Sequence, residues 1–327
     1  MSLPVLLCTN SFRDLPLADL SVSAAEWGFD GFEAVLGPGH WDLDRISQNP
    51  AWLDQIRASL QQHRLDIPLI AAHGLTTVFG DPYGPHWRRI LPASVWGEGD
   101  PASVVARAQR EFQKLIQSAE RFGIGMISGF TGSPLWGRLW TYPAPDAAEV
   151  DAAFAQMASI WRPLLDLCLG SGVRFAVEIH PGQMAFDIPT AHRLLESLDG
   201  HQALGFVVDP AHMVWQGVDP VQFVREFADR IWHVHLKDVS NRLDGSTSLL
   251  NSCVFSQHAP RPVEYRLAGR GSVDWESLAR MLNRIGYAGA VAVEGRDPHL
   301  DRSFAAAEGC QFGKRLFSGV VGAGAQG

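Results

Sequence analysis

The sequence predicts a closed α/β barrel in which eight parallel strands alternate with helices. Short apolar segments alternate with longer amphipathic segments along nearly the whole chain, and there are eight such units. Several apolar segments also follow a glycine that ends a helical pattern, as in WGFDGFEAV and RFGIGMISGF, and glycine just past a helix caps its C-terminus. An open doubly wound sheet is the alternative, but no GxGxxG motif follows the first strand.

The expected strands are short apolar runs, at 5–10, 31–36, 66–73, 124–131, 173–181, 204–209, 230–239 and 289–295. Apolar residues spaced three and four apart predict the helices between them. These helices span 17–27, 51–63, 101–122, 147–169, 189–199, 219–228 and 274–285, and a last one starts at about 301. Pro163 falls inside the fourth helix and is expected to kink or split it.

We expect one domain over residues 1–318 and a disordered tail over 319–327, where the sequence ends in VVGAGAQG. The connections after the third and seventh strands, 74–100 and 240–270, are long and rich in Pro, Gly and Trp. Connections of that length are usually lids or binding loops.

The composition is that of a soluble globular protein, with 46% hydrophobic and 19% charged residues and a formal net charge of −8. This charge argues against binding to nucleic acid or to an anionic membrane surface. No CxxC pair occurs among the four cysteines, and Cys8 and Cys168 are expected to be buried thiols. Without a signal peptide or an apolar run of membrane-spanning length, we expect a cytoplasmic protein.

Polar side chains occupy the ends of the third and of the fifth to eighth predicted strands. They are His73, Glu178, His180, Asp209, His212, His233, His235, Lys237 and Glu294. The carboxyl ends of barrel strands meet on one face, and charged groups at the end of an apolar strand are costly unless they are paired or bind a metal. The sequence therefore predicts a site on this face.

Each of these residues alone has an ordinary structural explanation. Glu178 could pair with Arg174, Asp209 could belong to an Asp-Pro turn, and His233 and His235 could be core histidines. Glu294 could act as an N-cap for the last helix. Their coincidence at the same end of four consecutive strands favours a site instead.

Three carboxylates and one imidazole form a mixed oxygen and nitrogen ligand set that suits Mn²⁺, Mg²⁺, Co²⁺ or Zn²⁺. Such a cation can polarise a carbonyl and hydroxyl pair on a sugar and stabilise an enediolate. A carboxylate beside it can move the proton.

Five tryptophans fall on the same predicted face: Trp41, Trp87, Trp96, Trp136 and Trp140. A tryptophan in a loop more often belongs to a small satellite core. Five together favour stacking on a flat, partly apolar ligand such as a sugar ring.

The segments VRFAVEIHPG, VVDPAHMVWQGVDP, IWHVHLKDV and GRGSVDWESLARMLNRIGYAGAVAVEG resemble the xylose isomerase-like TIM barrel superfamily, the sugar phosphate isomerase/epimerase group. The resemblance covers nearly the whole chain and is strongest over 173–295. It implies a divalent metal, often manganese, and it implies that the proteins often form homodimers. The implied metal ligands are Glu178, Asp209, His235 and Glu294, with His233 as the competing imidazole.

The resemblance also implies roles at the substrate. Glu178 and Glu294 would form the acid/base pair, and His212 would contact substrate oxygens. An arginine beyond the seventh strand often does the same in the family, and Arg242 or Arg270 would take that place here.

The favoured function is a metal-dependent isomerase or epimerase of a keto-sugar or keto-glycoside. Glu178 and Glu294 would exchange the proton. The expected substrate contacts are His73, His180, His212, Lys237, Arg270 and Trp136.

Three alternatives stay open. The first is a lyase or dehydratase that uses the same residues on a 3-keto-glycoside, a C-glycoside or a keto-inositol. The second is a barrel that binds carbohydrate without a metal, and the third is a nuclease, which the net charge disfavours. A phosphate-bearing substrate is less expected, because no glycine-rich loop or arginine pair stands out at the later strands.

Overall fold

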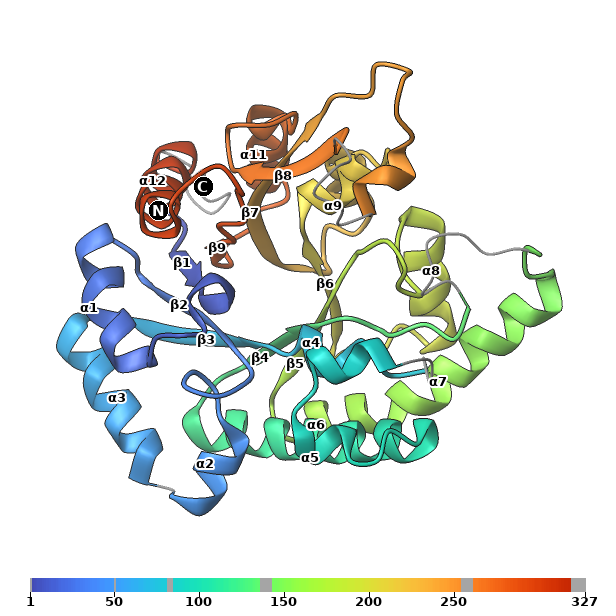
Figure 1. The fold of residues 1–327 in the computed structure, drawn as a ribbon, viewed down its shortest axis with the longest axis horizontal. Coiled ribbons are helices and arrows are strands. Elements are labelled where there is room, and N and C mark those ends of the chain that lie inside the picture. Colours follow the sequence, from blue (N-terminus) through green and yellow to red (C-terminus); the bar gives the residue numbers. More distant parts are fainter. Residues whose placement is uncertain (1, 50, 81–84, 136–142, 254–260, 319–327) are drawn as a thin grey trace, which may run out of the picture.

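The predicted barrel is confirmed by the computed structural model, which describes residues 2–49, 51–80, 85–135, 143–253 and 261–318. Eight parallel strands pair in the order β6-β5-β4-β3-β2-β1-β9-β7, and a β6–β7 pairing closes the ring (Figure 1). The barrel strands are β1 (Val5–Cys8), β2 (Gly31–Val35), β3 (Asp66–Ala71), β4 (Met126–Gly129), β5 (Arg174–Glu178), β6 (Leu204–Val208), β7 (Ile231–Asn241) and β9 (Val291–Val293).

Helices surround the barrel at the expected positions, to within a few residues. They are α1 (Leu17–Trp27), α3 (Ala51–His63), α6 (Pro101–Phe122), α7 (Ala147–Gly170), α8 (Ile188–Ser197), α10 (Pro220–Glu226), α11 (Trp275–Arg284) and α12 (Arg302–Leu316). The predicted glycine caps are present: Gly28 and Gly123 end α1 and α6 with φ of 89° and 90°, a conformation that favours glycine.

Several short elements lie between the barrel strands and the main helices, mostly in segments that the sequence analysis left as connections. They are η1 (Thr9–Phe12), α2 (Leu43–Gln48), α4 (His73–Thr76), η2 (Pro85–Arg89), α5 (Ala93–Trp96), α9 (Pro210–Trp215), η3 (Leu249–Cys253) and β8 (Val263–Leu267). The two long connections are therefore partly structured. The expected tail at 319–327 lies outside the described residues, and so do Trp136 and Trp140.

Strand β8 extends the sheet by pairing antiparallel with the far end of β7. Beyond it, the carboxylate of Asp238 on β7 accepts hydrogen bonds from the backbone of Gly269 at 3.0 Å and of Val273 at 3.0 Å, and from the indole of Trp275 at 2.8 Å. One buried side chain thus fixes the path from β8 to α11.

Pro163 was expected to kink or split its helix, and a split does not occur, because α7 is continuous with Pro163 inside it. Pro163 and Ser159, one turn earlier, both face solvent, so water can satisfy the carbonyl that loses its helical partner. Buried residues before and after the proline, such as Phe154, Trp161 and Leu165, hold both halves against the barrel.

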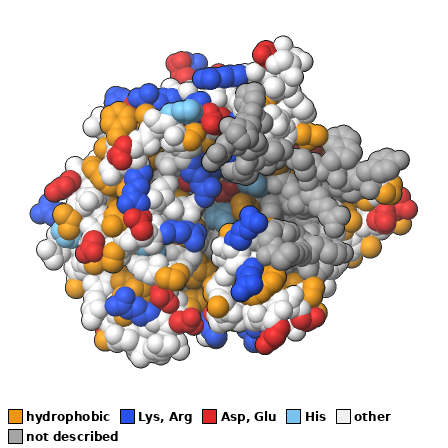
Figure 2. Space-filling model, in the orientation of Figure 1, with side chains coloured by type: hydrophobic (Ala, Val, Ile, Leu, Met, Phe, Trp, Pro, Cys, Tyr) orange, Lys and Arg blue, Asp and Glu red, His pale blue; other side chains and the backbone are white. Residues whose placement is uncertain are grey.

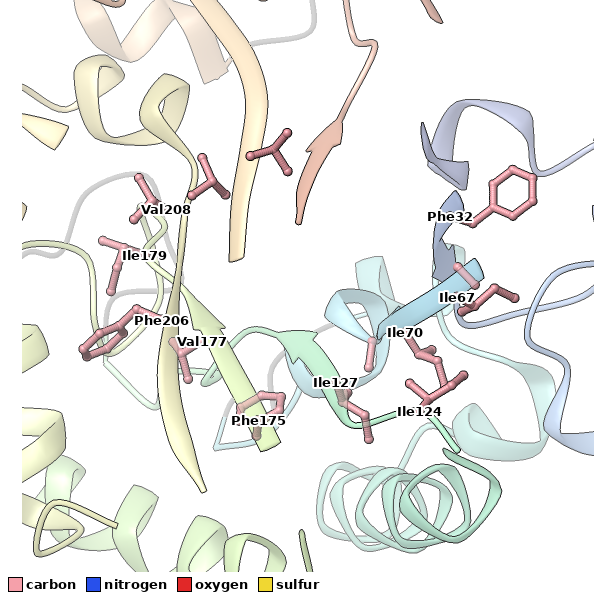
Figure 3. Packing of buried hydrophobic residues seen from close by; sticks show 14 of the residues in the cluster. Phe32, Ile67, Ile70, Ile124, Ile127, Phe175, Val177, Ile179, Phe206 and Val208 are labelled. Carbon is pink, nitrogen blue, oxygen red and sulfur yellow. The ribbon is translucent and has the colours of Figure 1, made fainter. Parts of the chain in front are cut away.

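Alternation along the strands determines what reaches the site. Outward side chains such as Ile127, Phe175 and Phe206 point towards the helices (Figure 3). Inward side chains form a smaller apolar cluster made of Leu6, Cys8, Val35, Leu69, Ala71, Met126, Ala176, Val207 and Ala292. Because successive side chains point to opposite faces, two further residues along β5 and β9 bring the inward series to Glu178 and Glu294.

Buried thiols are confirmed for Cys8 and Cys168, which are 4% and 0% exposed. Among the described residues, the helices include none that is both long and apolar enough to cross a membrane.

Gly132 provides a test of how tightly the connections above the barrel are packed. Its φ is 77°, and a Cβ there would overlap the Phe79 carbonyl group; its N–H donates to Gln183 at 2.8 Å. We expect Gly132→Ala to lower the free energy of unfolding by about 2–4 kcal/mol. Gly125→Ala, which meets nothing within 4 Å, should change it by less than about 0.5 kcal/mol. Urea denaturation measures both, and equal effects would contradict the packing described.

Candidate metal and substrate site

The candidate site is a cavity of about 220 Å³ at the carboxyl ends of the barrel strands. Acidic, basic and histidine side chains gather in this hollow at the centre of the face in Figure 2. Seven residues that the sequence analysis predicted for the site line it: His73, Glu178, His180, His212, His235, Lys237 and Glu294.

Asp209 lies beneath this cavity, fully buried, and is both a turn residue and a site residue. It is the N-cap of α9, and its Oδ1 accepts the N–H groups of Ala211 at 2.9 Å and His212 at 3.3 Å. Its Oδ2 is directed to the site, 3.1 Å from the Lys237 ammonium and 3.4 Å from Nδ1 of His235. The Asp-Pro turn therefore orients one carboxylate oxygen into the cluster.

Three carboxylates converge on Nδ1 of His235. Oε2 of Glu178 and Oδ2 of Asp209 each lie 3.4 Å from this nitrogen, and Oε2 of Glu294 lies 3.8 Å from it. The nitrogen is buried and has no aligned hydrogen-bond partner in the described structure. A buried polar atom without an aligned partner, facing three oxygens, fits the mixed ligand set of a divalent metal.

Glu33 on β2 lies behind His235 and was not predicted. Its Oε2 is 3.0 Å from Nε2 of His235 and 3.4 Å from Nε2 of His233, while Oε1 accepts the Ser128 hydroxyl at 2.8 Å. Burial opposes the charge on Glu33, but His235 and His233 outweigh it and hold its pKa well below the usual value. An acceptor on Nε2 leaves Nδ1 of His235 to face the carboxylates.

The ammonium group of Lys237 compensates the negative charge of Asp209 and Glu294. Its ammonium lies 3.1 Å from Asp209 and 3.0 Å from Glu294, and it donates to Nε2 of His212 at 2.8 Å. Burial disfavours the ammonium, but Asp209 and Glu294 outweigh this and raise the pKa of Lys237. Burial likewise opposes ionisation of Glu178, but His73, His235 and Lys237 lower its pKa to about 2.

Three further histidines surround the upper part of the cavity. His73, the first residue of α4, places Nε2 at 2.9 Å from Glu178. Burial, followed by the charge of Lys237, lowers the pKa of His212 well below its usual value. Because Nε2 of neutral His212 accepts from Lys237, its Nδ1 donates to the Tyr265 hydroxyl at 3.0 Å. Nδ1 of His180 lies 2.6 Å from the Pro181 carbonyl, and this ring packs on His212.

Some predicted substrate contacts are not brought to the cavity. Arg270 follows β8 and binds Glu308 on α12 at 2.7 Å. Trp136 lies outside the described residues. Trp41 is fully buried and donates to Ser118 at 2.9 Å, so the stacking role expected for it is wrong.

Arg13 and Arg296 line the cavity instead, although the sequence analysis singled out neither. Arg296 lies two residues after Glu294 and binds it through Nε at 2.8 Å. Arg296 could have been predicted, because it lies at the end of the same predicted strand as Glu294, where polar side chains indicate the site. Arg13 follows η1 and carries no comparable signal in the sequence.

The family model described as xylose isomerase-like TIM barrel matches residues 22–316. The chain belongs to this family.

Among curated proteins, the chain is similar to the uncharacterized protein YfiH of Bacillus subtilis, with 24% identity over 88% of this chain and 91% of that protein. It is 27% identical to an inosose dehydratase of Geobacillus kaustophilus over 43% of this chain and 47% of the dehydratase.

Solved structures share the barrel at low sequence identity. A xylose isomerase-like TIM barrel protein from Mycobacterium smegmatis in complex with magnesium matches with a TM-score of 0.68, 16% identity and 97% of each chain. The 3-keto-D-glucoside 4-epimerase YcjR of E. coli matches with a TM-score of 0.65 and 17% identity, over 96% of this chain and 99% of that one. These likenesses show the fold.

Lys237→Met should destabilise the metal-free protein, because it leaves Asp209 and Glu294 buried without their cation. Removing one partner of a buried ion pair costs about 3–5 kcal/mol. Lys114→Met is the control, since Lys114 pairs with Glu111 on the surface of α6 and such pairs contribute at most about 1 kcal/mol. Thermal denaturation with a chelator present measures both, and equal losses would show that Lys237 is not the compensating cation.

Proposed function

We propose that this protein is a divalent-metal-dependent isomerase or epimerase that moves a proton beside the carbonyl of a keto-sugar or keto-glycoside. One observation supports this most: Glu178, Asp209, His235 and Glu294 converge at the mouth of the barrel, with oxygens of the three acids within 3.8 Å of one imidazole nitrogen. These four residues are the proposed metal ligands. The bound cation would polarise the substrate carbonyl and its neighbouring hydroxyl.

Glu178 and Glu294 are the proposed acid/base pair. Neighbouring cations lower the pKa of both carboxyls against the effect of burial, so both are ionised and able to accept a proton. They follow β5 and β9, and β6 and β7 separate these strands in the barrel. Carboxyls at opposite ends of this arc can act on opposite faces of the substrate, as epimerisation requires: one accepts the substrate proton as a carboxylate, and the other, after taking a proton from solvent, donates it to the other face.

The remaining polar groups of the cavity suit substrate hydroxyls and the developing oxyanion. His73, His180 and His212 present ring nitrogens at the cavity wall, and the Lys237 ammonium lies beside Glu294. A cation held in a low-dielectric site stabilises negative charge as it forms on the substrate oxygen.

A lyase or dehydratase that uses the same residues is the second candidate. It is supported by the similarity to the inosose dehydratase and by a larger cavity of about 980 Å³ that adjoins the site. This cavity has room for a second sugar or an aglycone, which would be the leaving group. Mass spectrometry of the product separates the two reactions, since isomerisation leaves the substrate mass unchanged.

Glu294→Gln should abolish proton exchange, because the amide cannot accept the substrate proton. The measurement is deuterium incorporation into a panel of ketoses and 3-keto-glycosides by the manganese-loaded protein in deuterium oxide. We expect the rate to fall by at least about 100-fold, while Glu276→Gln on the exposed face of α11 leaves it unchanged. Exchange that persists at the original rate in Glu294→Gln would reject the assignment.

Glu33→Gln should weaken metal binding without removing a proposed ligand. The hydrogen bond to Nε2 of His235 fixes the imidazole, and loss of such partners typically costs about 10- to 100-fold in metal affinity. Calorimetric titration of Mn²⁺ into the chelator-treated protein measures this, with Glu276→Gln again as the control. An unchanged affinity in a folded Glu33→Gln protein would contradict a role for Glu33 in orienting His235.

A further inference from the structure

Two guanidinium groups stand at the mouth of the site and are not used by the proposed proton transfer. Arg13 follows η1, which comes directly after β1, and Arg296 lies three residues after the end of β9, the last strand of the barrel. Because β1 and β9 are neighbours in the barrel, both arginines arise from the same side of the mouth. Both also line the inner cavity of about 220 Å³ and the adjoining cavity of about 980 Å³, so they lie where the two spaces meet.

Neither guanidinium is fully used by the described protein. Nε of Arg13 donates to Oδ1 of Asn10 at 3.0 Å, and within the described part of the chain Arg13 forms no ion pair. Arg296 uses Nε to bind Glu294 at 2.8 Å. The terminal nitrogens of both groups remain available as paired donors, which is the geometry that binds carboxylate and phosphate oxygens.

The two cations also act on each other. Burial, and then the charge of Arg296, lower the pKa of Arg13. The ordinary function of a surface arginine, pairing with an acid, is fulfilled nearby by Arg302, which binds Asp14 at 2.8 Å. Arg13 is instead held beside a like charge, an arrangement that an anion between the two groups would stabilise.

We propose that Arg13 and Arg296 bind an anionic group of the substrate, a carboxylate or a phosphate, so that the substrate is an acidic keto-sugar derivative. The reacting carbons would occupy the inner cavity, and the anionic group would lie at its junction with the outer one. That the anionic group belongs to a substrate rests on the proposed function, but the anion site itself can be tested by binding measurements alone.

The test is calorimetric titration of the manganese-loaded protein with D-ribulose 5-phosphate, 5-keto-D-gluconate, inorganic phosphate and neutral D-fructose. We expect at least one anion to bind about 10-fold or more tightly than D-fructose. Arg13→Met should weaken that binding by about 10- to 100-fold, as expected for a charge-assisted hydrogen-bonded pair, and leave D-fructose and Mn²⁺ binding unchanged. Arg13→Lys should recover part of it, because lysine keeps the charge but not the paired donors.

Arg280→Met is the matched control, since Arg280 is exposed on α11 and pairs with Glu276. Preference for the phosphate or for the acid identifies the source of the anionic group. Anion binding that is unaffected by Arg13→Met is coordination to the metal alone and overturns the proposal, as does failure of all three anions to bind. Arginine-dependent anion binding without deuterium exchange rejects the proposed reaction but keeps the anion site. Deuterium exchange on neutral ketoses without arginine-dependent binding of any anion keeps the proposed reaction and rejects the anion site.

Discussion

The structure of the barrel mouth depends on the compensation of carboxylates that the fold buries side by side. Glu33, Glu178, Asp209 and Glu294 are all at most 7% exposed, and ionised groups at that depth are stable only with cations and hydrogen-bond donors around them. Lys237 and His235 provide this compensation from β7, the strand between β6 and β9. The strand that carries the imidazole ligand of the proposed site thus also carries the cation that compensates Asp209 and Glu294.

Strand alternation explains how an apolar barrel delivers this polar cluster. Along β7 the inward residues are His233, His235 and Lys237, and the outward residues Val234 and Leu236 pack under the helices. The inward positions nearer the amino ends of the strands are mostly small or medium apolar residues. The barrel interior is therefore apolar towards the amino ends of the strands and charged towards their carboxyl ends, with His233 and Glu33 at the boundary.

Much of this was predictable from the sequence, because the period of the strands and the residues that end them are local features. The barrel, its eight main helices and the gathering of Glu178, His235 and Glu294 in one place all follow from apolar periodicity and from the geometry of parallel strands. Asp209 could be predicted as a turn or as a site residue, and the structure shows that one oxygen serves each role.

What could not be predicted depends on contacts between distant segments. Glu33 lies within an apolar strand, and its role appears only when His235, 202 residues later, is placed beside it. Arg13 enters from a turn whose path the sequence does not define. Arg270 was a reasonable choice, but it follows β8, a strand within a Pro- and Gly-rich connection, and it binds Glu308 instead. Pro163 does not split α7, because buried neighbours on both sides hold the two halves against the barrel.

The pairing of β8 with β7 has a consequence for how this barrel can diversify. Five residues of each strand pair, from Lys237 with Leu267 to Asn241 with Val263, and Asp238 secures the chain beyond them. The two ends of the connection between these strands are therefore held next to each other by the pairing. Insertions or exchanges within it change only a loop whose ends are already fixed, and loop-closure entropy grows slowly with length. The sequence between the two strands can therefore change while the carboxylate cluster stays in place.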